Sequence, residues 1–248
     1  MAKDLFSKQA AGYSKWRPGY PASLIEYIVS FVNHRKIAWD CATGNGQAAV
    51  LLAEYFDQVF ATDLSESQLN YAKPHPRIIY SQSPAEHTLF SENTFDLVTV
   101  AQAYHWLDHE AFCKEVRRVC KSGAVAAVWG YGLCKSSRTD INDRFNAFYK
   151  DVTGPYWDPA RHYVDEEYRT VRFDFEEIPV QKTFSIQAIW TIRDLEGYLG
   201  SWSAVQNFIK INGYDPVAVF IEELSSHWSE DEPLPFEFPL FMRLGRVF

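Results

Sequence analysis

The chain has 248 residues, 47% of them hydrophobic, which is enough for a well-buried core in one large α/β domain or two small ones. Its formal net charge of −8 argues against a surface built for nucleic-acid phosphates or anionic lipid, since either partner would require a basic patch. No apolar run approaches the ~20 residues that span a bilayer, and the segment from Met1 to Lys8 lacks the apolar core of a signal peptide. We therefore expect a cytoplasmic protein.

The first predicted elements alternate between helix and strand. A helix follows Pro21, because the next apolar residues fall on one helical face and the proline suits a first turn. The apolar run from Lys36 to Cys41 then predicts a strand, which glycines separate from a helical stretch at Ala48 to Tyr55. A second apolar run, from Gln58 to Thr62, ends at Asp63. The order is strand, loop, helix, strand.

This alternation continues to about residue 130. Ser65 and Gln68 fit a capping box that opens a helix through Ala72. Further strands are predicted at 77–80, 95–101 and 124–129, with a helix capped by Asp108 between the last two. Five strands alternating with helices imply a parallel, doubly wound sheet.

Beyond Tyr131 the alternation weakens. A helix is expected at 139–151, and 154–159 is a loop rich in turn formers and aromatic residues, so we interpret 132–180 as an inserted cap that shapes the choice of substrate. The remaining part, 181–248, is expected to complete the same sheet. Its predicted elements are a strand at 182–191, helices at 194–210 and 216–228, and a closing strand at 236–247.

An acid followed by small residues marks the turn after the first strand. Ala42, Gly44 and Gly46 occupy alternate positions after Asp40, and small residues there let a ligand approach the backbone. The segment from Gly44 to Ala49 also satisfies the dinucleotide fingerprint G-x-G-x-x-G/A, with Asp63 about 20 residues on to hold a ribose. By this motif alone, a nicotinamide-dependent enzyme would fit.

Asp40 favours a different cofactor. A carboxylate facing the glycine loop would repel a pyrophosphate but could accept hydrogen bonds from the ammonium group of an amino-acid cofactor, and S-adenosylmethionine has that ammonium and no phosphate. The pattern acid-x-small-x-Gly-x-Gly at Asp40, Ala42, Gly44 and Gly46, with a ribose acid at Asp63, resembles the class I S-adenosylmethionine-dependent methyltransferases. Glycine is usual in that family where this chain has Ala42.

Other segments resemble the trans-aconitate methyltransferase-like branch of the methyltransferase type 11 group. They are Phe6 to Tyr13, Arg17 to Pro21, Gln102 to Trp106 and Tyr198 to Ala204. The resemblance implies an α/β, Rossmann-like, mainly parallel seven-stranded sheet with helices on both faces and a C-terminal insertion or cap. A single domain would span 1–248, with 1–35 as a helical segment over the cofactor and 36–131 as the cofactor-binding core.

The same resemblance implies which residues hold S-adenosyl-L-methionine, with S-adenosyl-L-homocysteine as the product. Asp40 and the glycine loop would face the methionine portion, Asp63 the ribose, and the segment from Ser83 to Glu86 the adenine. The expected cofactor site comprises Tyr13, Arg17, Asp40, Ala42, Gly44, Gly46, Gln47, Asp63, Leu64, Ser83, Ala85, Glu86, Ala101 and Gln102.

Aromatic residues near the fourth strand and in the C-terminal part are candidates for the substrate site. His105 is a candidate catalytic residue, either lining the site or transferring a proton, and Tyr104, Trp106 and Trp202 are candidate acceptor contacts. His105 also shares helical spacing with His109 and Cys113, but no carboxylate or thiol pair completes a recognisable site, so we predict no metal.

The resemblance favours methyl transfer to a small molecule, and O-methylation of a small carboxylic acid is the leading reaction. A carboxylate is an adequate nucleophile at neutral pH, so the protein need not supply a general base. The expected partner is a small-molecule acceptor rather than nucleic acid. Two alternatives stay open, a nicotinamide-dependent oxidoreductase and a non-catalytic protein that binds S-adenosylmethionine.

Overall fold

Five parallel strands form the centre of the sheet in the computed structural model, which describes residues 16–248. They lie in the order β3-β2-β1-β4-β5, so the chain winds outward through three strands and then returns to the other side of β1. Ligands of such sheets bind beyond the carboxyl ends of the strands where the winding reverses, which here is between β1 and β4. The five strands are β1 (Ile37–Cys41), β2 (Gln58–Asp63), β3 (Ile78–Gln82), β4 (Phe95–Ala101) and β5 (Cys120–Tyr131).

Antiparallel strands complete the sheet around β9 (Leu234–Arg246). This long strand pairs with β5 along one edge, and three short or peripheral strands pair with β9. Within residues 16–248 the sheet therefore has nine strands, against the seven that the sequence predicts, because β6 and β7 are too short to leave a periodic signal. The three added strands are β6 (Lys135–Ser136), β7 (Glu176–Ile178) and β8 (Phe184–Trp190).

Helices cover both faces of the parallel part, because side chains along each strand alternate between the faces. Trp39, Val98 and Val128 pack on one side beneath α5 (His109–Val119), whereas Leu97 and Ala127 pack on the other. The second face is covered by α2 (Ala22–Val29) and α3 (Gln47–Leu52), and the short α4 (Glu66–Leu69) follows β2. The predicted doubly wound α/β fold is confirmed.

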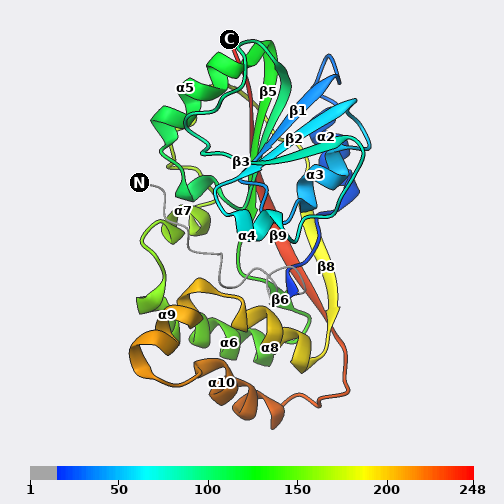
Figure 1. Ribbon diagram of the computed structural model, residues 1–248. Coiled ribbons are helices and arrows are strands. Elements are labelled where there is room, and N and C mark those ends of the chain that lie inside the picture. Colours follow the sequence, from blue (N-terminus) through cyan, green and yellow to red (C-terminus); the bar gives the residue numbers. More distant parts are fainter. Residues whose placement is uncertain (1–15) are drawn as a thin grey trace.

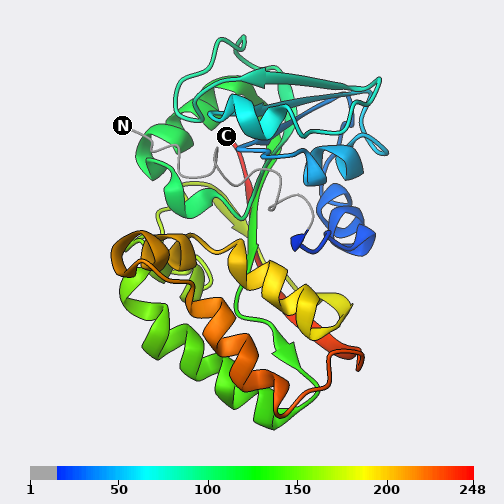
Figure 2. The same cartoon turned by 60° about the horizontal axis from the view of Figure 1, so that its bottom comes forward.

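A separate helical layer lies at the far end of β8 and β9 (Figures 1 and 2). Its own apolar core joins helices from 139–152 to helices from 192–225. The latter range is therefore not part of the sheet, although the sequence analysis groups it with the sheet-completing segment. The layer comprises α6 (Thr139–Ala147), η3 (Phe148–Val152), η4 (Gly154–Tyr156), α8 (Ile192–Gly200), α9 (Ser203–Asn212) and α10 (Pro216–Ser225), while α7 (Arg161–Asp165) leads back towards the sheet.

The helix predicted at 194–210 is in fact two helices. A capping box at Thr191 opens α8, which ends at Ser201, and Trp202 then takes an extended conformation that redirects the chain into α9. Trp202 is buried against Phe145 and Tyr198 in the helical layer. Burial of this large ring explains why the chain turns where apolar periodicity alone predicts continuity.

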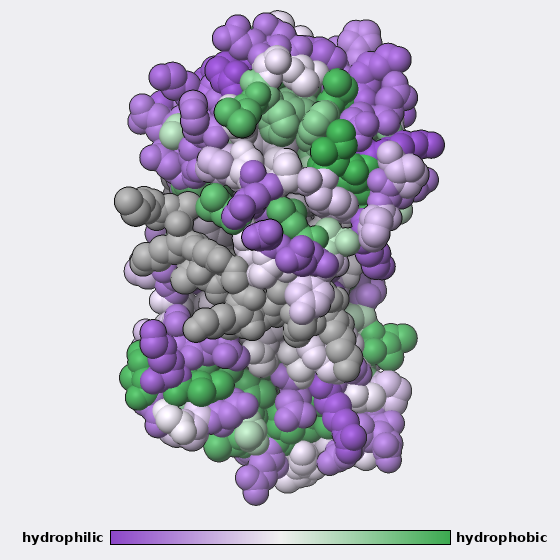
Figure 3. Space-filling model, in the orientation of Figure 1, coloured by the Kyte–Doolittle hydropathy of each residue, from purple (hydrophilic) through white to green (hydrophobic). Residues whose placement is uncertain are grey.

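On the coloured part of the face in Figure 3, hydrophilic side chains predominate around the top, and hydrophobic side chains gather in groups over the upper part and over the helical layer below. Among residues 16–248, no helix is both long enough and apolar enough to cross a membrane.

Candidate functional site

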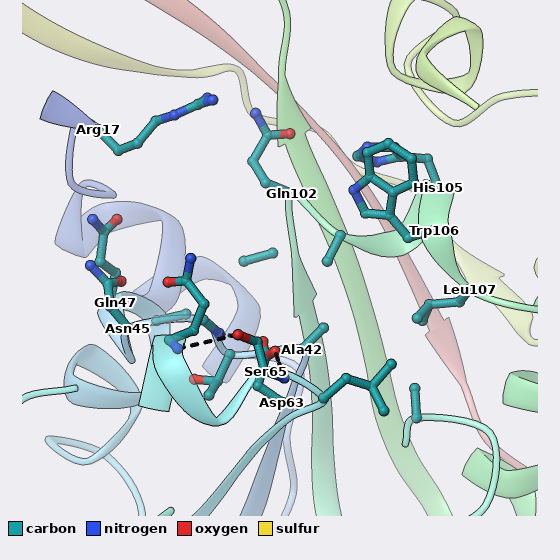
Figure 4. A pocket seen from close by; sticks show the side chains of 18 of the residues that line it. Arg17, Ala42, Asn45, Gln47, Asp63, Ser65, Gln102, His105, Trp106 and Leu107 are labelled. Carbon is teal, nitrogen blue, oxygen red and sulfur yellow. Dashed lines mark hydrogen bonds between the residues drawn. The ribbon is translucent and has the colours of Figure 1, made fainter. Parts of the chain in front are cut away.

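A cavity of about 350 Å³ opens at the carboxyl ends of β1, β2 and β4 (Figure 4). This is a common size for a small-molecule site. In Figure 4, Arg17 and Gln47 enter from one side and His105 and Trp106 from the other, with Gln102 between them. Asp158 and Ala160, from the segment between η4 and α7, also line the cavity. The cavity thus lies between the glycine loop and residues of the inserted segment.

Asp40 lies beneath the loop rather than on the cavity wall. It is fully buried, Thr99 donates a 2.7 Å hydrogen bond to Oδ1, and the Thr43 hydroxyl donates to Oδ2. Burial raises the pKa of Asp40 to about 6, and the hydrogen bonds from Thr43 and Thr99 oppose this rise. The sequence predicts that this carboxylate meets an ammonium group directly, whereas in the structure both of its oxygens accept hydrogen bonds from threonines, Thr43 in the loop and Thr99 in β4.

Asp63 is placed for a ligand at the end of β2. Its Oδ2 accepts a 2.8 Å hydrogen bond from the backbone N–H of Gly44, and its Oδ1 accepts one of 2.8 Å from Ser65. Ser65 in turn caps α4 through the Gln68 N–H. Since each carboxylate oxygen has a second lone pair, Asp63 can accept further hydrogen bonds at the cavity wall, which it lines.

Left-handed backbone conformations shape the loop. Ala42, Gly44 and Gly46 have φ of +53°, +58° and +82°. A Cβ at Gly46 would lie 2.5 Å from the Tyr80 hydroxyl oxygen, so glycine is required there for packing as well as for conformation. Alanine at position 42 is costly in this region of φ, which accounts for glycine being usual in the family it resembles.

Most residues predicted for the cofactor line the cavity. Asp40 and Gly46 are the exceptions, because one supports the loop from below and the other faces Tyr80. Tyr13 lies outside the described residues. The predicted residues that line the cavity are Arg17, Ala42, Gly44, Gln47, Asp63, Leu64, Ser83, Ala85, Glu86, Ala101 and Gln102.

Two of the three candidate acceptor contacts do not line the cavity. Tyr104 is fully buried beneath α5 and donates a 2.6 Å hydrogen bond to the Arg172 carbonyl, while Trp202 is buried in the helical layer. The reason for Tyr104 is local, since the 3₁₀ turn η2 (Tyr104–Trp106) directs neighbouring side chains to different sides. Trp106 lines the cavity, and its contact with the acceptor stays a prediction.

His105 lines the cavity as a neutral imidazole. Its Nδ1 lies 3.0 Å from the Tyr168 hydroxyl oxygen. Burial, followed by the charge of Arg161, lowers the pKa of His105 to about 3. A histidine with so low a pKa is a weak proton acceptor, so the geometry supports a site-lining role and not the proton transfer that the sequence analysis weighs.

Arg17 and Gln102 bring polar groups to the cavity on the side of β5. Arg17 donates a 3.1 Å hydrogen bond to the Tyr131 hydroxyl, and its guanidinium lies over the Tyr198 ring. Gln102 has a positive φ of +55°, and its side-chain amide donates to the Tyr131 carbonyl at 3.1 Å. Its Oε1 is buried and has no hydrogen-bond partner among residues 16–248.

Some lining residues have no counterpart in the sequence-based prediction. Thr43 and Asn45 could have been inferred from their place between the loop glycines, and Ser65 from its position after Asp63. Tyr131, Asp158 and Ala160 carry no local signal beyond their place in or beside the cap.

No three His, Cys, Asp or Glu side chains in the described part of the chain are grouped so that they could hold a metal ion. His109 instead donates Nε2–H to the Tyr104 carbonyl at 3.0 Å, and Cys113 is buried.

Comparisons with known proteins agree on one type of enzyme. A family model described as a methyltransferase domain matches residues 39–128. A Dictyostelium discoideum protein named as a methyltransferase is 31% identical over 252 residues, covering 98% of this chain and 95% of that protein. A Saccharomyces cerevisiae protein named as an S-adenosylmethionine-dependent methyltransferase is 25% identical, covering 96% of this chain and 95% of that protein.

A solved structure shows the same likeness in three dimensions. It comes from Anaeromyxobacter dehalogenans and is described as a type II methyltransferase. The two chains share 36% identity and superpose with a TM-score of 0.85, over 94% of this chain and 98% of the other. The similarity therefore includes the helical layer as well as the parallel sheet.

Proposed function

Since the chain belongs to the class I S-adenosylmethionine-dependent methyltransferases, we propose that it transfers the methyl group to an oxygen of a small carboxylic acid. Membership of this family replaces the nicotinamide-dependent alternative. The bound cofactor supplies a methyl group activated on a sulfonium. The protein must then align the acceptor oxygen in line with that methyl and exclude water.

The residues around the cavity fit the cofactor chemically. Asp63 can accept hydrogen bonds from ribose hydroxyls, because it lines the wall and a carboxylate oxygen can accept more than one hydrogen bond. The loop from residue 40 to residue 48 contains no lysine or arginine for a pyrophosphate. Ala42 and Gly44 leave little side-chain bulk between the backbone and a ligand. Ser83, Ala85 and Glu86 form the wall that we assign to the adenine.

The observation that carries the choice of acceptor is the burial of the His105 imidazole in the cavity wall. With its pKa lowered to about 3, this imidazole cannot take a proton effectively from an alcohol. The described lining residues include neither lysine nor cysteine. A carboxylate needs no deprotonation at neutral pH, so it suits a site without a strong base. Arg17 adds a permanent positive charge that can hold such an anion.

Methyl transfer from labelled cofactor tests this proposal. The protein is incubated with S-adenosylmethionine carrying a deuterated methyl group and a panel of small mono-, di- and tricarboxylic acids, matched to their amides and alcohols. Mass spectrometry should detect deuterated methyl esters of acids only. Methylation of the amides or alcohols in preference to the acids would refute the proposed acceptor, and no S-adenosylhomocysteine from any acceptor would support the non-catalytic alternative.

A further inference from the structure

The His105 imidazole lines the cavity, and one of its two nitrogens is hydrogen-bonded to the protein. Nδ1 is 3.0 Å from the Tyr168 hydroxyl, whereas no described residue hydrogen-bonds Nε2. His105 lines the cavity next to Trp106 (Figure 4). Because a neutral imidazole carries one proton, the nitrogen that pairs with Tyr168 decides what the other offers to a ligand.

A phenol is a stronger acid than a neutral imidazole, and an imidazole nitrogen is a stronger base than a phenol oxygen. The favoured arrangement therefore has Tyr168 donating its O–H to Nδ1. The proton of His105 then lies on Nε2, which becomes the hydrogen-bond donor that this cavity-lining ring can offer to a ligand. The same arrangement removes the basic lone pair from the cavity, in keeping with the absence of a proton-transfer role.

Tyr168 is fixed from several directions. Its side chain is fully buried, with the Phe241 ring centroid at 5.0 Å and that of Tyr104 at 5.6 Å. Arg243 donates a 2.9 Å hydrogen bond to the Tyr168 carbonyl. Both Glu167 and Tyr168 have left-handed φ, at +57° and +58°. Such a backbone is unfavourable for a bulky residue and persists where the surroundings over-determine it, often at functional sites.

We propose that Tyr168 is a positioning residue that holds His105 as an Nε2–H donor to the oxygen of the carboxylate that is not methylated. This deepens the proposed function and rests on it for the identity of the ligand. With Arg17 entering from the opposite side of the cavity, the acceptor is then a small anion held by two donors. Its second oxygen is left to attack the methyl group, while the carbon skeleton meets Trp106 and Ala160.

The tautomer of His105 can be measured without an activity assay. Nitrogen NMR of protein labelled with ¹⁵N in its histidine rings, with the His105 signals assigned by their loss in His105→Gln, should show a protonated Nε2 and an unprotonated Nδ1. Tyr168→Phe should convert His105 to a mixture of tautomers. A matched control is Tyr104→Phe, which also removes one buried phenol hydroxyl from the same core but leaves the His105 ring unchanged.

Kinetics test the consequence for the acceptor. Tyr168→Phe should raise KM for the acid about tenfold, as expected for weakening one hydrogen bond to a charged group, while the dissociation constant of S-adenosylmethionine changes less than twofold. Tyr104→Phe should change neither. His105→Gln, whose amide N–H can replace the Nε2–H, should keep most of the activity, and adding Tyr168→Phe to it should cause no further loss. His105→Glu should lose the methylation activity, because an ionised glutamate side chain can only accept hydrogen bonds.

Two results would overturn the proposal. One is a wild-type His105 protonated on Nδ1, and the other is a Tyr168→Phe enzyme with unchanged KM and an unchanged tautomer. If no acid is methylated at all, the proposed function fails by itself, and the NMR result still decides whether Tyr168 sets the tautomer of His105.

Discussion

The buried polar groups at the two ends of the parallel strands lie in different environments. At the amino end, Asp96 accepts hydrogen bonds from the backbone N–H groups of Lys36 and Ile37 at 3.0 Å each, and Lys121 pairs with it at 2.7 Å. At the carboxyl end, Asp40 has a raised pKa. The same end holds Gln102, which combines a left-handed backbone with an unpartnered amide oxygen.

This contrast separates what stabilises the fold from what prepares a site. A fully paired carboxylate lowers the free energy of the folded chain, whereas strained residues and an unsatisfied acceptor raise it. The chain keeps the unfavourable features where the strand order reverses and the cavity opens. Substitutions at the amino end should therefore lower stability without changing ligand binding, whereas substitutions at the carboxyl end should change ligand binding or relieve an unfavourable feature without lowering stability.

The largest effect is expected at the amino end, from Asp96→Ala. The change leaves two partly buried N–H groups without their acceptor and breaks a partly buried ion pair, so unfolding in urea should show a loss of about 3 kcal/mol. Calorimetry on the folded fraction should find the dissociation constant of S-adenosylmethionine within twofold of the wild type. A large change in that constant would break the separation between the two ends.

The next largest effect is expected from Asp63→Asn, and it should appear in the binding of S-adenosylmethionine. Replacing the carboxylate removes two charge-assisted hydrogen bonds to ribose, so the dissociation constant of S-adenosylmethionine should rise about 100-fold. The matched control is Asp57→Asn. Asp57 is exposed, lies directly before β2, and forms an ion pair of 3.2 Å with Lys36. The control should leave binding unchanged and stability within about 0.5 kcal/mol. Equal effects of the two variants would contradict the ribose role.

Asp40→Asn should change stability in a pH-dependent way. A raised pKa means that the folded state holds the proton more tightly than the unfolded state, so this group lowers stability as pH rises from about 4 to about 6, and the penalty is complete above that range. The neutral amide of asparagine does not incur this ionisation penalty. Asp40→Asn should therefore be more stable than the wild type by about 1–3 kcal/mol at pH 8, and no more stable at pH 4. Urea unfolding at both values measures the difference.

The same substitution should weaken cofactor binding. Ionised Asp40 lies behind the loop as a negative charge that favours a cationic ligand, so wild-type affinity for S-adenosylmethionine should fall several-fold below pH 6. Affinity of Asp40→Asn should be lower at pH 8 and flat between pH 5 and 8. A wild-type affinity that is equally independent of pH would show that the charge of Asp40 does not affect binding of the ligand.

Ala42→Gly should have the smallest effect. Glycine removes the cost of left-handed φ but adds freedom to the unfolded chain, so the net gain in stability should be at most about 1 kcal/mol. Ala49→Gly in the regular helix α3 is the opposite control and should lose about 1 kcal/mol. A loss at both positions would show that the conformation of Ala42 carries no strain.

The sequence predicted the parallel sheet and the loop correctly because both depend on local patterns. Apolar runs that end at Asp40 and Asp63 give the strands, and the glycines give the turn. The family and its cofactor, inferred from the same pattern, are confirmed. The roles of the individual site residues stay predictions.

What the sequence could not give depends on contacts between distant segments. Asp40 is buried with a hydrogen bond from Thr99 on another strand, and the low pKa of His105 results from burial and from the charge of Arg161 in the inserted segment. Tyr104 and His105 are adjacent in the chain, yet one is core and the other lines the cavity. Trp202 belongs to a helical layer with an apolar core of its own, and no local sequence pattern distinguishes such a core from an acceptor pocket.

A crystal structure with S-adenosylhomocysteine tests the central claim most directly, because that claim places the cofactor at the carboxyl ends of β1, β2 and β4. The expected result is a ribose whose hydroxyls lie within hydrogen-bond distance of the Asp63 carboxylate, with His105 and Trp106 beyond the sulfur on the side left for the acceptor. A nucleoside bound elsewhere, or a ribose that does not touch Asp63, would contradict it.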